Sequence, residues 1–488
     1  MSIETVLLIG AALVLLSLFI TKAVDNIGLP SLLLFLGVGM AFGPEGLKVL
    51  SFSDPSIARS LGIVALVFIL FSGGLETEWR HVRGIMREGV LLATLGVLIT
   101  AALAALFAWK ILGFSAPVSL LIGSIIASTD AAAVFAILRG QSLQLRGGLR
   151  PLIELESGTN DPMAIFLTVS MIALIQEGEL QWWVVLISFL RQMLLGAVVG
   201  LAAGWLMGHL VNRLRFRNEG LGAVFTLAFA FFLFGLTDKL EGSGFLAVYL
   251  AGIMLGNSTV LQKKTLVRFW DSLAWLSQIA MFVTLGIFVL PSQLKLILVQ
   301  GLLLSAALVF IARPAAVYLS LSLSRMGLRE KTFVAWVGIR GAVPIILATF
   351  PLTQGIPGAQ MVFHIVFFVV LTSALLQGWT LPLAARVLGV SSKGDASRKS
   401  PIEAIGAEGF DGEIADFILP FNSAWAAMPI VEIPLPEEAL ILLVCRNGKY
   451  LVPGGATSLE DLDVITVLHR KKDAEALQEI MARSKPPA

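Results

Sequence analysis

Long apolar stretches alternate with short polar ones along residues 1–390. The hydrocarbon core of a bilayer is about 30 Å thick, which a helix of roughly 20 residues can cross. Division of the apolar sequence at its polar interruptions therefore predicts thirteen membrane-spanning helices. They cover residues 3–24, 29–43, 59–75, 89–110, 117–138, 151–175, 182–211, 219–237, 243–257, 266–290, 295–323, 330–351 and 360–388.

Two of these predicted helices are interrupted by polar residues. The fifth contains Ser128-Thr129-Asp130 between two apolar runs, and the twelfth contains Gly338-Ile-Arg-Gly-Ala-Val-Pro344. If the seventh helix is a linker, both breaks fall on the fifth helix of a six-helix half. Matched breaks are typical of inverted repeats that bind substrate near the bilayer midplane. The pattern predicts an all-α membrane fold of two inverted six-helix repeats with discontinuous helices 5 and 12.

The character of the chain changes after residue 390. Residues 391–412 are polar and predict a linker, whereas 413–488 show short strand patterns followed by a helix at 471–482. Asn447-Gly448 is a hairpin signal between two of the strands. We therefore expect a transmembrane domain over 1–390 and a small α+β domain over 413–488, which is small enough to favour pairing with a second copy. The strands are predicted at 414–419, 430–433, 439–445, 449–452 and 464–468.

The composition agrees with a membrane protein that crosses the bilayer many times. Hydrophobic residues make up 57% of the 488 residues and charged residues only 14%, whereas soluble domains are about 45–50% apolar. The one cysteine, Cys445, excludes an internal disulfide framework. Lysine and arginine gather in alternate loops, which the positive-inside rule places in the cytoplasm, so the N-terminus lies outside and residues after 388 inside. The basic loops contain residues 80–87, 139–150, 213–217, 263–268, 325–331 and 386–393.

The sixth predicted helix carries three carboxylates within otherwise apolar sequence. At 100° per residue, Glu154, Ser157 and Asp161 share one stripe of this helix. Glu156 and Asn160 share a neighbouring stripe. A polar helix end near the membrane surface is the alternative, but apolar runs flank the segment and the fifth helix also carries an acid. An ionisable residue at membrane depth marks an ion or substrate path by default.

The polar groups of the fifth and sixth helices suit a cation. A bound cation must exchange water for oxygen ligands, and a negative charge must offset its desolvation. A carboxylate withdrawn from water also takes up a proton more readily, so one acid can hold a proton or a cation but not both. With access from alternate sides, this competition suffices for cation/proton antiport. The candidate ligands are Asp161, Asp130, Thr129, Ser157 and Asn160.

Arg340 lies within the twelfth predicted helix, where an unpaired guanidinium is costly. We expect it to pair with a carboxylate. Glu156, on the stripe that faces away from Asp161, is the preferred partner, and Glu154 is the alternative.

Four motifs carry a family resemblance when they are taken together. They are Ser128-Thr-Asp130, Glu156-Ser-Gly-Thr-Asn-Asp-Pro162, Gly242-Ser-Gly-Phe-Leu-Ala-Val248 and Gly338-Ile-Arg-Gly-Ala-Val-Pro344. Over residues 1–390 the chain resembles the NhaP-type sodium(potassium)/proton antiporters of the monovalent cation:proton antiporter-1 family. Residues 413–480 are similar to a TrkA-C regulatory domain, and the combination most resembles the CvrA subgroup of potassium/proton antiporters.

The resemblance implies a homodimer in the bacterial inner membrane, surrounded by lipid. A core domain would move against a dimerisation domain in an elevator-like manner. The resemblance also implies that Asp161 carries both proton and cation, and that Ser157 and the Thr129–Asp130 region complete the site.

The resemblance assigns roles to four further residues. Asn160 stands where electrogenic relatives have a second aspartate, which implies electroneutral exchange. The family places a structural ion pair between Glu156 and Arg340. Glu76 matches a glutamate that joins the site in some NhaP proteins, although an ordinary solvated acid is the alternative.

The resulting prediction is a potassium/proton antiporter that is not an enzyme and needs no cofactor. Sodium or lithium is the alternative cargo, because side-chain identity does not fix cavity size or ligand geometry. A regulated cation channel would be expected to have a filter loop, which the sequence lacks. An intramembrane enzyme with paired aspartates would leave the break at Arg340 unexplained. The tail has no glycine-rich nucleotide fingerprint, so NAD and ATP are not expected, whereas a small nucleotide-like ligand is compatible with it; no nucleic-acid partner is expected.

Overall fold

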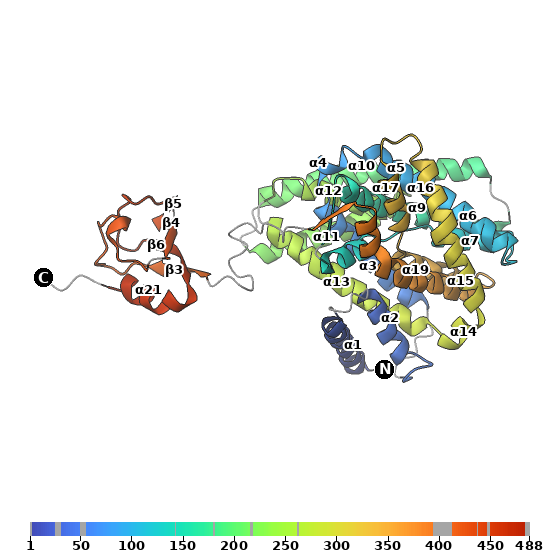
Figure 1. Ribbon diagram of the computed structural model, residues 1–488, viewed down its shortest axis with the longest axis horizontal. Coiled ribbons are helices and arrows are strands. Elements are labelled where there is room, and N and C mark those ends of the chain that lie inside the picture. The colour runs from blue at the N-terminus through green and yellow to red at the C-terminus, as the bar shows by residue number, and fades with distance from the viewer. Residues whose placement is uncertain are drawn as a thin grey trace. The chain divides into compact units, whose positions relative to one another are not determined.

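The computed structural model describes residues 2–24, 31–48, 55–141, 143–178, 181–214, 218–260, 263–393, 412–436, 438–446 and 449–483. The chain forms two compact units, Met1–Lys393 and Gly394–Ala488, whose elements are labelled in Figure 1.

The first unit is mainly helical. Its α-helices are α1 (Ile3–Val24), α2 (Ser31–Phe42), α3 (Pro55–Glu76), α4 (Trp79–Val82), α5 (Met86–Leu91), α6 (Val97–Lys110), α7 (Ala116–Ile125), α8 (Ala131–Gly140), α9 (Leu149–Glu177), α10 (Trp182–Leu214), α11 (Glu219–Lys239), α12 (Gly244–Gly256), α13 (Lys263–Phe288), α14 (Pro291–Leu296), α15 (Leu298–Ala307), α16 (Arg313–Ser320), α17 (Leu328–Trp336), α18 (Ala342–Thr353) and α19 (Ala359–Val387). The π-helical turns η2 (Leu92–Gly96) and η3 (Leu308–Ala312) join α5 to α6 and α15 to α16. Two short strands, β1 (Leu143–Leu145) and β2 (Ser391–Lys393), pair antiparallel.

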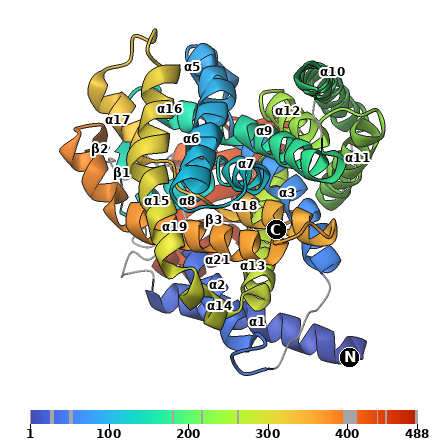
Figure 2. The same cartoon turned by 90° about the vertical axis from the view of Figure 1, so that its right-hand side faces the viewer.

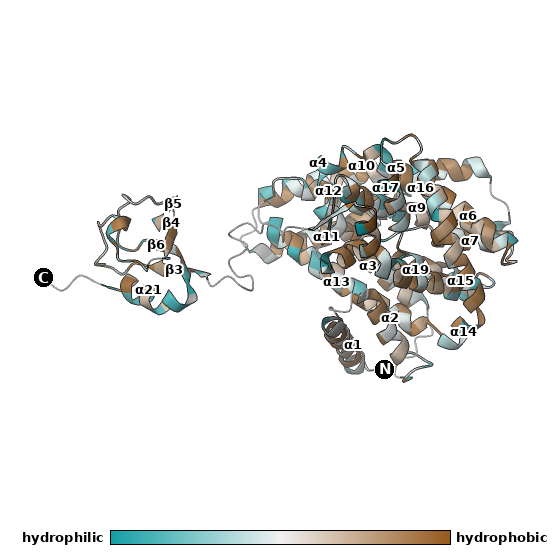
Figure 3. Ribbon diagram, viewed as in Figure 1, coloured by the Kyte–Doolittle hydropathy of each residue, from teal (hydrophilic) through white to brown (hydrophobic). Residues whose placement is uncertain are grey.

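The apolar pattern along the chain corresponds to these helices. Among the described residues, eight helices are long and apolar enough to cross a membrane, and six shorter helices are also apolar. Figure 3 shows hydrophobic residues along most helices of this unit. Each of the thirteen predicted segments overlaps a helix, a continuous helical stretch or, at the fifth and twelfth, a pair of helices. The prediction of a helical membrane fold is confirmed.

The helices pack in two groups. In the first, α12 packs against α3 and α10, and α13 packs against α2 and α3. In the second, α7 packs against α6 and α9, and α19 packs against α15 and α18. Figure 2 shows α10, α11 and α12 on one side and α15, α16 and α17 on the other. The two groups meet where α18 packs against α3.

Both predicted helix breaks are present, and they lie against each other. Residues 128–130 are extended between α7 and α8, and residues 338–341 separate α17 from α18. The N–H of Asp130 donates to the carbonyl oxygen of Ile339 at 2.8 Å. The approach requires glycine, because a Cβ at Gly341 would lie 1.8 Å from Oδ2 of Asp130. The discontinuous helices are thus confirmed, whereas the inverted repeat stays a prediction.

The second unit is a small α+β domain, as predicted. It has a four-stranded antiparallel sheet in the order β3-β6-β4-β5, and α21 packs its buried Leu477 and Met481 into the same core as Ile465 and Val467 of the sheet. The elements are β3 (Gly412–Ile418), β4 (Leu440–Arg446), β5 (Lys449–Leu451), β6 (Val464–Arg470) and α21 (Ala474–Met481), with 3₁₀ turns η4 (Ile430–Glu432) and η5 (Lys471–Asp473).

One strand, one turn and the linker of the predicted tail are treated separately. The strand predicted at 430–433 is wrong, because η4 occupies it; prolines at 429 and 434 flank this segment and cannot donate to a sheet ladder. Asn447-Gly448 lies outside the described residues, although Arg446 pairs with Lys449 across β4 and β5. Of the predicted linker, Ser391–Lys393 instead forms β2 in the first unit and Gly412 begins β3, while residues 394–411 lie outside the described residues.

Candidate functional site

A cavity of about 470 Å³ opens beside the crossing of the two broken helices. Its wall includes the whole predicted polar stripe of α9, which consists of Glu154, Ser157 and Asp161. Glu156 and Asn160, on the neighbouring stripe, do not line it. The break between α7 and α8 contributes Ser128, Thr129 and Asp130. Two further acids line the same cavity, Glu76 at the end of α3 and Asp271 of α13. Most of the predicted polar groups therefore meet in one place.

Asp161 is buried within α9, with 5% of its surface exposed. One carboxylate oxygen, Oδ1, accepts a hydrogen bond of 2.6 Å from the hydroxyl of Ser128. Among the described residues no group donates to the other oxygen, Oδ2. Because Asp161 lines the cavity, this oxygen is available to a ligand there.

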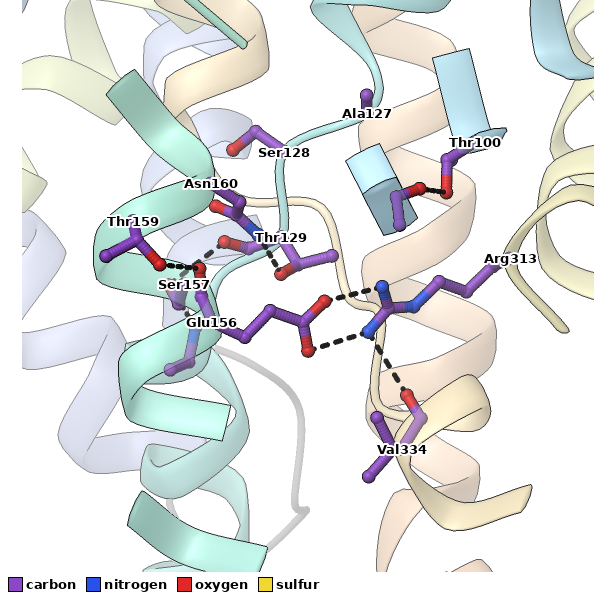
Figure 4. A network of polar contacts seen from close by, with 12 residues as sticks. Thr100, Ala127, Ser128, Thr129, Glu156, Ser157, Thr159, Asn160, Arg313 and Val334 are labelled. Atoms are coloured by element: carbon purple, nitrogen blue, oxygen red, sulfur yellow. Dashed lines mark hydrogen bonds and ion pairs between the residues drawn. The ribbon is translucent and has the colours of Figure 1, made fainter. Parts of the chain in front are cut away.

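Two other side chains of α9 hold the extended segment between α7 and α8. The Ser157 hydroxyl donates to the Thr129 carbonyl oxygen at 3.0 Å and accepts from the N–H of Ala131 at 3.1 Å. The Asn160 amide donates to the Thr129 hydroxyl at 2.6 Å (Figure 4). These bonds replace the helical partners that the broken chain lacks. Ser157 and Thr129 line the cavity, whereas Asn160 is fully buried and contacts it only through its bond to Thr129.

Asp130 caps the helix that follows it. Its Oδ1 accepts from the N–H of Ala133 at 3.2 Å, and its extended backbone is that of an N-cap residue. A negative charge is stabilised at a helix N-terminus, where N–H groups lack partners. Asp130 therefore lines the cavity with one of its carboxyl oxygens engaged as a helix cap.

Glu156 forms a buried ion pair with Arg313 of α16. The two guanidinium nitrogens Nη1 and Nη2 donate to Oε1 and Oε2 at 2.5 and 2.9 Å (Figure 4). Both side chains are at most 4% exposed. In a bidentate pair of this kind each group neutralises the charge of the other, and the planar guanidinium matches the two carboxylate oxygens with two parallel hydrogen bonds. Glu156 thus faces away from the cavity, as its position on the second stripe predicts.

The predicted ion pair between Glu156 and Arg340 is wrong. Arg340 instead donates from Nη1 to the carbonyl oxygens of Ala127 and Ser128 at 2.9 and 2.6 Å. These carbonyls follow the last turn of α7, where helical partners run out. Among the described residues Arg340 forms no ion pair, so its charge acts on the carbonyl dipoles of the helix end.

Sequence reasoning missed several residues that support the site. Arg313, which lies within the eleventh predicted helix, is the partner of Glu156, and the sequence pattern did not pair the two. Gln377 of α19 donates to the carbonyl oxygen of Trp336 at 2.7 Å, and it accepts from the hydroxyl of Ser373 at 2.6 Å. Ser373 in turn accepts from the N–H of Arg340 at 3.1 Å. This chain of bonds holds the break between α17 and α18, and its only sequence signal was polarity within an apolar helix.

The described residues include no group of three His, Cys, Asp or Glu side chains that could hold a metal ion. The cavity wall instead carries single carboxylates from several elements, together with the hydroxyls of Ser128, Thr129 and Ser157.

Family models match both units of the chain. The model described as "Sodium/hydrogen exchanger, transmembrane" matches residues 12–387. A model of the TrkA-C domain matches residues 414–482.

Several known proteins are similar to the chain over nearly its full length. It is 39% identical over 489 residues to the K(+)/H(+) antiporter NhaP2 of Shewanella oneidensis, covering 99% of this chain and 84% of that protein. It is 38% identical over 490 residues to the K(+)/H(+) antiporter NhaP of Alkalimonas amylolytica, covering 98% and 83%. The solved structure of the sodium proton antiporter MjNhaP1 from Methanocaldococcus jannaschii at pH 8 aligns with a TM-score of 0.70 at 26% identity. That alignment covers 79% of this chain and 99% of that one.

Proposed function

Because the chain belongs to the sodium/hydrogen exchanger family and carries a TrkA-C domain, we propose that it is an electroneutral potassium/proton antiporter. It exchanges one cytoplasmic cation for one external proton. Potassium is favoured because the relatives at 39% and 38% identity are named as K(+)/H(+) antiporters. The cargoes are ions, so the proposed reaction needs no cofactor and makes or breaks no covalent bond other than to protons.

The observation that carries this proposal is the position of the Asp161 carboxylate and its hydrogen bonding. It is a buried carboxylate at the wall of a cavity, with one oxygen held by Ser128 and the other available. A proton on that carboxyl removes the charge that a cation needs, and a bound cation occupies the oxygen that the proton needs. Proton and cation therefore compete for one group.

The proposed cation site consists of oxygens around that carboxylate. Asp161 supplies the charge, and the Ser157 hydroxyl and Thr129 supply neutral oxygens that the hydrogen bonds already orient. Water from the cavity fills the remaining positions. Asn160 carries no charge. A proton or a monovalent cation bound at Asp161 therefore adds one positive charge to the site in either case, and the exchange of one for the other is electroneutral.

Alternating access completes the proposal. The cavity wall includes Arg139, at the end of α8, and Arg150, at the start of α9. The positive-inside rule assigns the basic connection between these two helices to the cytoplasm. The described state is then open to the cytoplasm of a bacterial inner membrane, with the N-terminus outside and the TrkA-C domain inside. Glu76 and Asp271 give the cavity a negative field that draws cations toward Asp161. As in the family resemblance, the working unit is a homodimer, and the tail responds to a small ligand.

Exchange can be tested with the purified full chain in proteoliposomes that hold a preset pH gradient. Addition of K⁺ should collapse the gradient, and an imposed membrane potential should leave the rate unchanged within twofold. Asp161→Asn is the matched variant and should give no collapse. No response of the folded wild-type protein to any of K⁺, Na⁺, Li⁺ and Rb⁺ would contradict antiport, and a strong dependence on potential would contradict electroneutrality.

The same assay separates potassium from sodium. The chain is also 29% identical, over 353 residues, to the Na(+)/H(+) antiporter 1 of Methanocaldococcus jannaschii. Selectivity depends on cavity size and ligand geometry, so the rates with the four cations decide it. A collapse by Na⁺ or Li⁺ at least tenfold faster than by K⁺ would reassign the cargo and leave the rest of the mechanism in place.

A further inference from the structure

Tyr249 of α12 packs directly against the helix that carries Asp161. Its ring lies against Gly158, where an added Cβ would be 2.2 Å from Cζ and 2.7 Å from the hydroxyl oxygen. The hydroxyl makes a long hydrogen bond of 3.4 Å to the carbonyl oxygen of Glu154. Tyr249 is 2% exposed and lines the cavity. Gly158 thus forms a notch in α9 that only a residue without a side chain can provide.

The base of this aromatic ring is held firmly. A Cβ at Gly74 of α3 would lie 2.4 Å from the carbonyl oxygen of Tyr249 itself, and one at Gly252 of α12 would lie 2.6 Å from the carbonyl oxygen of Phe71. On another side, a Cβ at Gly200 of α10 would lie 2.6 Å from Cα of Ala247. Backbones in such close contact cannot shift past one another without separating. The ring therefore projects from a rigid unit of α3, α10 and α12.

The site helix belongs to the other group of helices. α9 packs mainly against α5 and α7, and it meets α12 through a much smaller contact. Any movement of the site relative to α3 and α12 must therefore move Gly158 relative to Tyr249. Because Gly158 lies next to Ser157 and one turn before Asp161, that movement also moves the candidate ligands.

We propose that Tyr249 is a positioning residue whose ring, seated in the Gly158 notch, fixes α9 and Asp161 against α12 only while the cavity is open. The inference rests on the proposed exchange function, because it concerns a movement that exchange requires. In this state the ring sets the depth of Asp161 in the cavity. When α9 moves, the ring leaves the notch and the hydrogen bond to Glu154 breaks. A side chain at position 158 would collide with the ring. It therefore excludes the state in which the cavity is open, but not the state in which α9 has moved away from Tyr249.

Thiol labelling can report the open state independently of transport. Cys445→Ser removes the one native cysteine, and Ala132→Cys places a thiol on the cavity wall. In this background Gly158→Ala should lower the rate of labelling by a membrane-impermeant maleimide at least fivefold and raise the KM for cytoplasmic K⁺. Gly73→Ala is the matched control, because Gly73 also lines the cavity but an added Cβ there meets nothing within 4 Å. It should leave the labelling rate and KM within twofold.

Variants of Tyr249 separate the ring from overall stability. Tyr249→Ala combined with Gly158→Ala removes the clash and should restore most of the labelling rate. Tyr249→Phe keeps the ring and should resemble the parent within twofold. Labelling of folded Gly158→Ala at the parental rate would overturn the proposal, as would failure of Tyr249→Ala to restore it.

Two further results complete the test. If Gly158→Ala does not fold, Tyr249→Ala alone should change the KM for K⁺ at least threefold at unchanged thermal stability, and an unchanged KM would overturn the proposal. A parent that labels normally but exchanges no cation would instead contradict the proposed function.

Discussion

The carboxyl group of Asp161 has the clearest expected effect of any single residue. Asparagine has the same shape, and its oxygen can still accept the hydrogen bond from the Ser128 hydroxyl. It can neither carry the transported proton nor supply the negative charge that offsets the cation. Asp161→Asn should therefore lower exchange at least a hundredfold while the unfolding temperature is unchanged or higher, because a buried ionisable group is removed. Exchange in proteoliposomes and thermal unfolding in detergent measure the two effects. Exchange above a tenth of the wild-type rate would show that another group carries the proton.

The Glu156–Arg313 pair should matter for stability. Arg313→Met leaves the Glu156 carboxylate buried without a partner, which costs about 3–5 kcal/mol in comparable cases. The double variant Glu156→Gln with Arg313→Met removes both charges and should recover at least half of the loss. Thermal unfolding in detergent measures both. Equal destabilisation by the single and double variants would contradict the pairing.

The residues of the site could be predicted from the sequence to different degrees. Asp161, Ser157 and Thr129 were identified because oxygen-bearing side chains are conspicuous within apolar helices. The partner of Glu156 was not, because both Arg313 and Arg340 lie inside predicted membrane-spanning segments. Only the way the helices cross decides which guanidinium reaches the carboxylate and which reaches the carbonyls at the end of α7.

At the scale of elements, the crossing of the two broken helices depends on Gly341. Gly341→Ala would place a Cβ 1.8 Å from Oδ2 of Asp130, so the two extended segments would have to separate. We expect a loss of about 1–3 kcal/mol, as for other overpacked sites, together with loss of exchange. Gly37→Ala in α2 is the matched control, since an added Cβ there meets nothing within 4 Å. Unfolding temperatures of the two variants that agree within one degree would contradict this account.

The elements themselves were more predictable than their contacts. Apolar length located the helices, and glycine, proline and charge located both breaks. The sequence could not show that the breaks bond to each other through Asp130 and Ile339, because that contact joins segments more than 200 residues apart. Nor could it show that Gln377 and Ser373 hold the second break, since their polarity alone names no partner.

At the scale of the whole molecule, the chain consists of two units with separate hydrophobic cores. Deletion of residues 395–488 should leave at least a third of the exchange rate, because every candidate ligand lies in the first unit. The deletion should change the response of exchange to pH or to cation concentration, because a TrkA-C domain is regulatory in the proposed function. Exchange of the truncated and full chains, measured side by side across pH, provides the test. Complete loss of exchange in a folded truncated protein would contradict the division of roles.

The most direct test of the central claim is the number of protons released when a cation binds. Purified protein in weakly buffered detergent solution, titrated with K⁺ beside Asp161→Asn, reports this number through a pH-sensitive dye. At a pH where the free carboxyl is mostly protonated, competition at this one group predicts close to one proton per bound cation for the wild type and none for Asp161→Asn. It also predicts a Kd for K⁺ that rises about tenfold for each unit of pH lowered while the protonated form predominates. Cation binding without proton release, or equal release by Asp161→Asn, would contradict the claim that Asp161 exchanges the two cargoes.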